Sequence, residues 1–235
     1  MTLDWKIEKI DYNDIFYKKG IVELAKQAFE NDWSESFEWK YLKNPFGQAF
    51  GYVAIFQDEI IGSLAMFPQK INNYGKMISG IQLGDVMASP KYRGHGARVV
   101  TSLLRHAREE AKDKKYEFGI GFPGQLSYLL LTKLGKWQDI GEISSCLTLV
   151  FPLRFFFKKS NLIHIKNVDN FTQEYDVFWD KVKEYYGFTT HRSSEYLNWR
   201  YIKNKLNKYN VFSAYNAQNE LIAYSVIKFI TSAKI

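Results

Sequence analysis

The residues best suited to chemistry lie between Lys91 and Gly96, where the sequence reads Lys-Tyr-Arg-Gly-His-Gly. Two glycines allow the backbone to curl so that several N–H groups point to one place. From Ala97 onwards, apolar residues recur at helical spacing, and a helix N-terminus adds unpaired N–H donors and a positive dipole end. We therefore expect this segment to hold a phosphate or pyrophosphate group.

The spacing of the glycines excludes two common phosphate-binding motifs. The dinucleotide fingerprint needs three glycines in the pattern G-x-G-x-x-G and an acidic residue about 20 residues later. Only Gly94 and Gly96 fit that pattern here. The P-loop needs a Gly-Lys-Ser or Gly-Lys-Thr run, which the sequence lacks. A glycine-rich turn that binds nothing is the alternative interpretation.

An apolar strand that ends near Ser89 precedes the loop, and a helix follows it. In this order the loop resembles the acetyl-CoA loop of the GNAT N-acetyltransferase superfamily, with the motif Gln/Arg-x-x-Gly-x-Gly/Ala. Arg93, Gly94 and Gly96 match it, while Lys91 stands where the family prefers Gln or Arg. The resemblance implies acetyl-CoA or CoA as co-substrate and no metal. The cofactor-binding residues it implies are Val86, Met87, Ala88, Arg93, Gly94, His95, Gly96, Ala97, Arg98 and Ser127.

The segments after the loop continue the resemblance in part. A short apolar strand over 116–122 and a helix over 125–134 are followed by Gly135, as in the GNAT order. Gly124 replaces the usual Asn of that helix. Leu131 occupies the position, four before the glycine, where the family often carries a tyrosine that acts as general acid. The family's usual proton donor is therefore missing at this position.

Acyl transfer to an amine needs an oxyanion donor and a group that removes a proton from the ammonium. We expect the backbone N–H groups of residues 86–88 to stabilise the oxyanion, and Asp85 to act as base directly or through water. Tyr128 is the candidate donor for the thiolate. The alternatives are a bulge carboxylate bonded to the backbone and a packed tyrosine. Four aromatic residues form either an acceptor wall or part of the core: Trp33, Phe37, Trp39 and Tyr41.

The sequence also contains an internal repeat about 160 residues apart. The run FEWKYLKN at 37–44 returns as LNWRYIKN at 197–204, and apolar hairpins follow both runs. This spacing is too long for a solenoid and suggests a duplicated domain. We predict a GNAT catalytic domain over 1–150, a connector over 151–175 and a partial second repeat over 176–235, in which Trp199 is equivalent to Trp39.

Composition limits the other classes of function. A net charge of +7 over 235 residues comes from Lys and Arg that are dispersed among acidic residues, which does not indicate nucleic-acid binding. One cysteine, Cys146, and four histidines indicate neither a disulfide framework nor a zinc site. The start of the chain lacks the pattern of a secretory signal, and no apolar run approaches 18 residues, so we expect a cytoplasmic protein without a membrane partner. The aromatic run 151–159 is expected to pack between the two halves.

Together these patterns predict an α/β (α+β) fold with a mixed, mostly antiparallel sheet and helices on both faces. The strands before Ala97 and after Tyr116 must be parallel, because a crossover helix joins them. In the GNAT fold this strand pair splays apart. The expected function is acetyl transfer from acetyl-CoA to a primary amine of a small molecule or amino sugar. A CoA-binding module without turnover and a tandem-GNAT aminoacyl transferase of the cell-wall type, which uses tRNA, are the alternatives.

Overall fold

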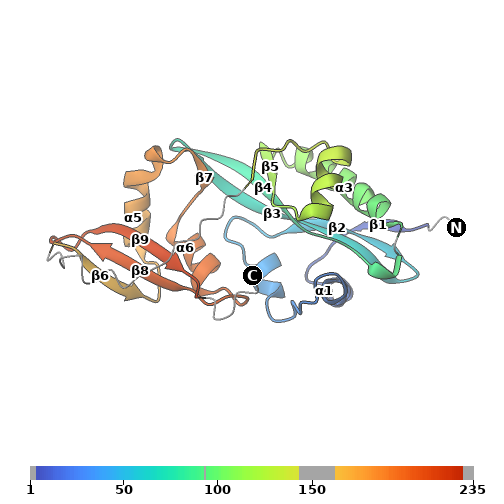
Figure 1. Ribbon diagram of the computed structural model, residues 1–235, viewed down its shortest axis with the longest axis horizontal. Coiled ribbons are helices and arrows are strands. Elements are labelled where there is room, and N and C mark those ends of the chain that lie inside the picture. Colours follow the sequence, from blue (N-terminus) through green and yellow to red (C-terminus); the bar gives the residue numbers. More distant parts are fainter. Residues whose placement is uncertain (1–3, 93, 143–161, 230–235) are drawn as a thin grey trace.

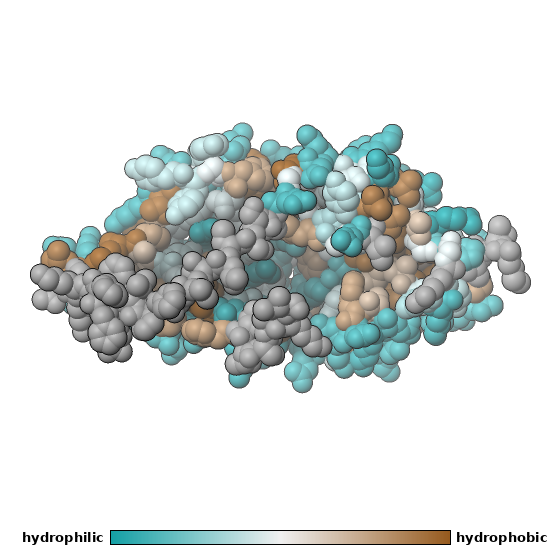
Figure 2. Space-filling model, in the orientation of Figure 1, coloured by the Kyte–Doolittle hydropathy of each residue, from teal (hydrophilic) through white to brown (hydrophobic). Residues whose placement is uncertain are grey.

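The computed structural model describes residues 4–92, 94–142 and 162–229. These described residues form two sheets, one at each end of an elongated molecule (Figure 1). Within them, the first sheet has six strands and the second has three. In the view of Figure 2, hydrophilic residues cover much of the surface, and the hydrophobic residues lie among them in small groups.

Five strands of the first sheet follow the chain in the order β1-β2-β3-β4-β5. Among the described strands of this sheet only β4 and β5 pair in parallel, and the other pairs are antiparallel, as the sequence predicts. The strands are β1 (Lys6–Lys9), β2 (Phe50–Phe56), β3 (Glu59–Asn73), β4 (Lys76–Ala88) and β5 (Phe118–Gly121). The helices and turns of this half are α1 (Ile15–Phe29), α2 (Phe37–Tyr41), η1 (Pro90–Tyr92), α3 (Gly96–Asp113), α4 (Gln125–Leu129) and the π-helical turn η2 (Leu130–Leu134).

Helices cover both faces of this sheet, with α3 on one side and α1 on the other (Figure 1). The α3 helix is amphipathic, and its apolar side packs on the sheet in a core that contains Val99, Leu103 and Leu131. On the opposite face, α1 and α2 form a second core around Leu24, Phe37 and Tyr41. Burial of these two apolar faces is the main term that stabilises the sheet between them.

The strand β4 contains a bulge near its end. Ser63 of β3 pairs with Met87 and Ala65 pairs with Gly84, so Asp85 and Val86 lie opposite one residue of β3. On its other side, β4 pairs with β5 only over residues 80–83. The parallel pair therefore separates where the bulge begins, at the end of β4 that leads into the glycine loop.

The second half begins with β6 (His164–Val168), which pairs with β8 (Asn210–Tyr215), and β8 pairs with β9 (Leu221–Ile227). The strand β7 (Phe188–Thr190) leaves this half and pairs with residues 71–73 of β3. The remaining elements are α5 (Gln173–Val182), η4 (Lys183–Tyr185), α6 (Ser194–Leu197) and the π-helical turn η5 (Asn198–Ile202). Their core contains Phe171, Tyr175, Leu197 and Val211.

The two halves share an order of elements. The order β6-α5-α6-β8-β9 follows that of β1-α1-α2-β2-β3, apart from the excursion of β7. The register of the β2–β3 hairpin shifts between Ala54 and Ile55, and that of the β8–β9 hairpin shifts at the positions 160 residues later, between Ala214 and Tyr215. The repeat in the sequence therefore falls on corresponding strands of the two halves.

Several predicted boundaries differ from the structure. The range 151–175, expected to be a connector, contains β6 and the first residues of α5. These elements were missed because their side chains show little likeness to those of β1 and α1, whereas the shared backbone pairing becomes visible only in the fold. Residues 137–142 form no strand. Residues 143–161, including Cys146 and the aromatic run 151–159, lie outside the described residues.

Candidate functional site

The glycine loop lies between η1 and α3, where the sequence places it. Gly94 has φ +94°, in the region that residues other than glycine rarely adopt, and open space surrounds the position of an added Cβ. Gly96 begins α3, and a Cβ there would make an ordinary contact of 3.5 Å with that of Ala88. Arg93, the remaining motif residue, lies outside the described residues.

The N-terminus of α3 is free of features that would compete with an anion. No side chain caps the helix at His95, and the first turn contains no acidic residue. The buried Nδ1 atom of His95 has no hydrogen-bond partner in the described part of the chain. The 18-residue length of α3 gives it a full dipole, whose positive end faces the loop.

A shallow groove of about 330 Å³ runs beside this helix end. Two arginines, Arg98 and Arg105, line it. The Arg98 guanidinium lies 5.3 Å from the ring centre of Trp5, within the range of a cation–π contact. The groove thus presents positive charge next to the loop. Its other lining residues are Ala97, Thr101, Ser102 and Leu134.

The bulge of β4 holds Asp85, the predicted base, in an unusual conformation. Its φ is +51°, which costs most L-residues about 1–2 kcal/mol, although Asp tolerates it better than others. One carboxylate oxygen accepts a hydrogen bond from Lys40 Nζ at 2.7 Å, and the other accepts one from Tyr41 Oη, also at 2.7 Å. Both donors come from α2. The bulge carboxylate is thus bonded to side chains rather than to the backbone.

Lys40, Asp85 and Tyr41 are largely buried, and this burial determines how much the loss of one group would destabilise the others. The side chains of Lys40 and Asp85 are 18% and 11% exposed, so removal of either partner leaves a charge that water stabilises poorly. Burial, with the nearby Asp85 charge, raises the pKa of Tyr41 well above its usual value, and that hydroxyl remains a donor at neutral pH. Tyr12 stacks on Tyr41 at 4.6 Å between ring centres.

The residues that follow Asp85 alternate between the two faces of the sheet. Val86 and Ala88 pack against the core on the α3 side, and Met87 is buried in the core on the α1 side. None of the three has a register partner on β5 within the described chain, because that pairing stops at Leu83. Their backbone therefore borders the gap between the separating strands.

Tyr128, the predicted donor for the thiolate, lies on α4 and is 39% exposed. Its hydroxyl donates a hydrogen bond to Asp139 Oδ2 at 2.7 Å. This bond and the charge of Asp139 raise the pKa of Tyr128. Asp85 and Tyr128 thus have partners on different elements, α2 and the segment after η2. Ser127, on the same helix as Tyr128, is half-buried.

The four aromatic residues near the bulge are all buried, and their roles differ. Phe37 and Tyr41 belong to the core beneath α2. Trp33 faces the ammonium of Lys40, which lies 3.7 Å from its ring centre. Trp39 points to the second half of the chain. Leu131, which replaces the common tyrosine, packs in the core on the α3 side.

Sequence reasoning missed Lys40 as a site residue. A signal was present, because the internal repeat places a basic residue at the same position in both copies, Lys40 and Arg200. The repeat marks the position of Lys40 but does not identify its partner. Asp85 lies 45 residues away in the sequence and contacts Lys40 only in the folded chain.

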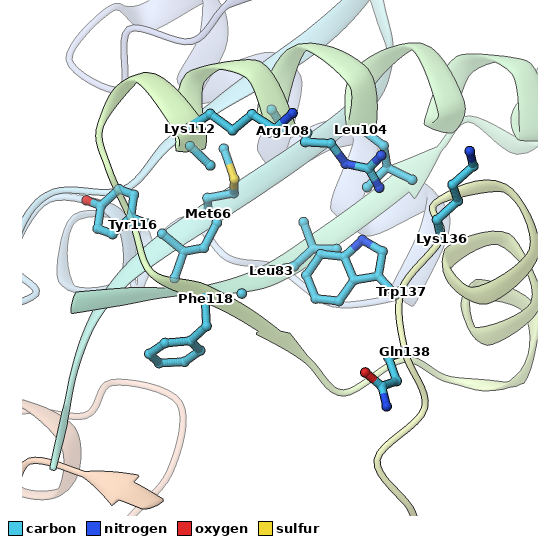
Figure 3. A pocket seen from close by; sticks show the side chains of 14 residues that line it. Met66, Leu83, Leu104, Arg108, Lys112, Tyr116, Phe118, Lys136, Trp137 and Gln138 are labelled. Atoms are coloured by element: carbon cyan, nitrogen blue, oxygen red, sulfur yellow. The ribbon is translucent and has the colours of Figure 1, made fainter. Parts of the chain in front are cut away.

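A pocket of about 310 Å³ lies on the α3 side, under the C-terminal half of that helix (Figure 3). Leu83 of β4 lies on its floor, Leu104 extends into it from α3, and the indole of Trp137 forms one wall. None of the predicted site residues lines it. Nowhere in the described ranges do three or more potential metal ligands form a group. No helix among those residues is long and apolar enough to cross a membrane.

A solved structure shares this fold at low sequence identity. A protein of Enterococcus faecalis V583, described as a probable N-acyltransferase, is 14% identical with a TM-score of 0.67. The match covers 97% of this chain and 56% of that one, so the present chain spans a little over half of the other's length. A predicted acetyltransferase from Clostridium acetobutylicum, solved with acetyl-CoA, is 18% identical with a TM-score of 0.47 and coverages of 61% and 96%.

Glucosamine-6-phosphate N-acetyltransferase from Arabidopsis thaliana is 15% identical, with a TM-score of 0.44 and coverages of 62% and 99%. No curated protein matches the sequence. A sequence model of the GNAT acetyltransferase domain matches residues 14–138, which is more than half of the chain. This match contains both the bulge of β4 and the glycine loop. The chain therefore belongs to the GNAT acetyltransferase family.

Proposed function

We propose that this acyltransferase moves an acetyl group from acetyl-CoA to a primary amine of a small molecule or amino sugar. The observation that carries the proposal is the arrangement at the end of β4. A left-handed glycine and an uncapped helix N-terminus follow a strand that has just separated from its parallel neighbour. Such a site offers N–H donors to a pyrophosphate and a gap for an extended arm.

The cofactor is assigned to the loop and to the start of α3. The N–H groups of Gly94, Gly96 and Ala97 would bind the pyrophosphate, with His95 and Arg98 beside them. Arg93 is expected to add a further positive charge. Val86, Met87 and Ala88 would contact the pantetheine arm through their backbone, and Ser127 would border it from α4. Acetyl-CoA supplies the activated thioester.

The chain's own residues would then act on charge and protons. Backbone N–H groups of residues 86–88 stabilise the oxyanion, since donors fixed in place need no reorganisation during the reaction. Asp85 takes the proton of the acceptor ammonium, directly or through water. An alkyl ammonium of pKa about 10 must lose a proton before it attacks, whereas a thiol of pKa about 8.5 leaves readily as the anion. Asp85 should therefore matter more than Tyr128.

We also propose that the second half is a partial copy of the first. The shared order of elements, the matching bulges and the position of the tryptophan in each copy support this. The folded copy would begin at His164, earlier than the boundary of 176 predicted from the sequence. We assign the first half as the catalytic unit and no cofactor site to the second half.

A CoA-binding module without turnover is the second candidate. The observation that favours it is the replacement of the usual tyrosine by Leu131, a buried core residue. The experiment begins with titration of CoA into the purified chain by calorimetry. Release of free thiol is then followed with acetyl-CoA and a panel of alkyl amines, aminoglycosides and amino sugars.

Binding together with amine-dependent thiol release supports the transferase. Binding without release for every amine tested supports the module instead. Failure of CoA to bind at micromolar concentration contradicts both candidates. A rise in melting temperature with tRNA, but not with CoA, would favour the aminoacyl transferase.

A further inference from the structure

We propose that Lys40 is a positioning residue for acyl transfer and that the second half of the chain holds Lys40 in place through Trp199. The inference rests on the proposed function, because it assigns Lys40 a role at the bulge beside which the thioester is expected to lie. Lys40 does not itself take part in the reaction. It fixes Asp85, and through Asp85 the direction of the following backbone.

The contacts of Lys40 define one position for its ammonium. Nζ lies 2.7 Å from Asp85 Oδ1 and 3.7 Å from the ring centre of Trp33. A carboxylate and the face of an indole both attract a cation, and both are largely shielded from water here. The side chain is thus held by two different elements, β4 and the segment before α2, while its own backbone lies on α2.

Asp85 transmits this constraint to the backbone of β4. The residue has a positive φ inside the bulge, and its side chain is drawn to the α2 side by Lys40 and Tyr41. Rotation of the backbone at this residue would move the carboxylate away from both donors. The donors therefore fix the direction in which β4 continues through Val86 and Met87, the residues assigned to the oxyanion.

The second half contacts α2 through a pair of tryptophans. The indole N–H of Trp39 donates to the backbone carbonyl of Trp199 at 2.7 Å, and the indole of Trp199 donates to the carbonyl of Trp39 at 2.9 Å. The two rings stack at 5.2 Å between centres. A five-residue helix has little stability of its own, so these contacts and those with Asp85 decide where α2 lies.

This geometry gives the second half a function although no cofactor site is assigned to it. The second half fixes the position of α2 through Trp199, and α2 fixes the bulge through the hydrogen bonds of Lys40 and Tyr41 to Asp85. Figure 1 shows α6, which leads directly into the turn that bears Trp199, at the middle of the molecule beside the first half. Trp199 contacts Trp39, and the next residue of the same helix, Lys40, contacts Asp85. The second half is thus connected to the bulge through α2, with no loop between the contacts.

Four variants test the proposal. Lys40→Met removes the charge and retains most of the apolar stem, and Lys40→Arg restores a cation of similar reach. Lys43→Met is the matched control, because Lys43 is exposed and pairs with Glu38 on the surface. Trp199→Phe keeps a ring at the joint but removes the indole donor, and it acts at a distance from the bulge.

Two measurements are compared for each variant. Amide hydrogen exchange over residues 84–88 is recorded without any ligand. The values of kcat and KM are measured with acetyl-CoA and an accepted amine, alongside CoA affinity by calorimetry. We expect faster exchange and a kcat lowered by about tenfold to a hundredfold in Lys40→Met, the range that misplacement by about 1 Å produces. CoA affinity should be kept, because the pyrophosphate binds at the loop.

Lys40→Arg should recover most of the kcat, Trp199→Phe should reproduce the effect of Lys40→Met in weaker form, and Lys43→Met should match the parent. Exchange and kcat at parental levels in Lys40→Met would overturn the proposal. So would an inactive Lys40→Arg with parental exchange, since Lys40 would then act other than by position. If Lys40→Met fails to fold, Trp199→Phe and Lys40→Arg decide by the same two criteria.

A parent that shows no turnover would refute the proposed function. The exchange data would still decide whether Lys40 orders the bulge.

Discussion

At the scale of single residues, the two glycines of the loop are not equivalent. Gly94 requires glycine because of its backbone angle, while the surrounding space is open. Gly96 has neither a positive φ nor a close neighbour and begins a helix. The sequence pattern treats both as motif residues, and the structure separates a conformational requirement from a preference.

We therefore predict that Gly94→Ala weakens CoA binding by about tenfold, since a strained left-handed Ala costs on the order of 1–2 kcal/mol. Gly96→Ala should bind CoA like the parent. Calorimetric titration of both variants with CoA checks this, and circular dichroism confirms that both fold. Equal affinities for the two variants would show that the conformation of Gly94 is unimportant for the site.

The second prediction at this scale concerns the proton. Asp85→Asn should lower turnover at neutral pH by about a hundredfold or more, the usual effect of losing a general base, while CoA affinity is kept. Tyr128→Phe should cost far less, because a thiolate needs little help to leave. Steady-state thiol release with a saturating amine measures both. Full activity in Asp85→Asn would remove the carboxylate from the chemistry.

At the scale of elements, close approach of a strand and a helix places the loop. A Cβ added to Gly62 of β3 would lie 2.3 Å from Val99 Cγ1 on α3, so the two backbones meet only because residue 62 has no side chain. Val99 is itself buried in the core beneath α3. The position of the loop thus depends on how closely α3 packs on the sheet.

We predict that Gly62→Ala lowers the free energy of unfolding by about 1–3 kcal/mol, the usual cost of overpacking a core. Val99→Ala removes the colliding methyl groups, so the double variant should be more stable than the sum of the single effects predicts. Urea unfolding of the parent, both single variants and the double variant measures this coupling. Strictly additive effects would mean that the clash is relieved elsewhere.

Sequence patterns predicted the elements better than the contacts between them. The apolar spacing from Val99 to Ala107 predicts α3, and the crossover rule makes β4 and β5 parallel, both as found. The pairing of Asp85 with Lys40 and Tyr41 was not predicted, because it joins residues more than 40 positions apart. Periodicity reports which face of an element is buried, whereas the partner across the core depends on register and packing.

At the scale of the whole molecule, the halves are joined by backbone pairing as well as by the tryptophans. The strand β7 extends the first sheet along β3, and the buried side chain of Asn72 donates to the carbonyl oxygens of Lys183 and Tyr186. The backbone N–H of His191 donates to the carbonyl of Lys70. These backbone and side-chain hydrogen bonds form a polar joint between the two halves. The stability of the molecule should therefore be sensitive to ionisable side chains at this joint.

His191 should make this joint sensitive to acid. Burial, together with the charge of Lys70, lowers the pKa of His191 below its usual value of 6.5. Its neutral ring accepts a hydrogen bond from the indole of Trp179 through Nδ1 at 2.9 Å, and protonation of that atom would break the bond. As the pH falls below 6.5, His191 binds a proton more readily in the unfolded chain than in the folded one. The free energy of unfolding therefore decreases as the pH falls through the pKa of His191 in the folded chain.

The test compares the parent with His191→Asn, whose side-chain oxygen can still accept the bond from Trp179 but does not titrate. The free energy of unfolding, measured in urea, should fall between about pH 7.5 and about pH 5.5 in the parent and fall less in the variant. His164→Asn is the control, because it makes the same substitution at an exposed histidine on β6. The same slope in the parent and in His191→Asn would show that the joint does not sense this proton.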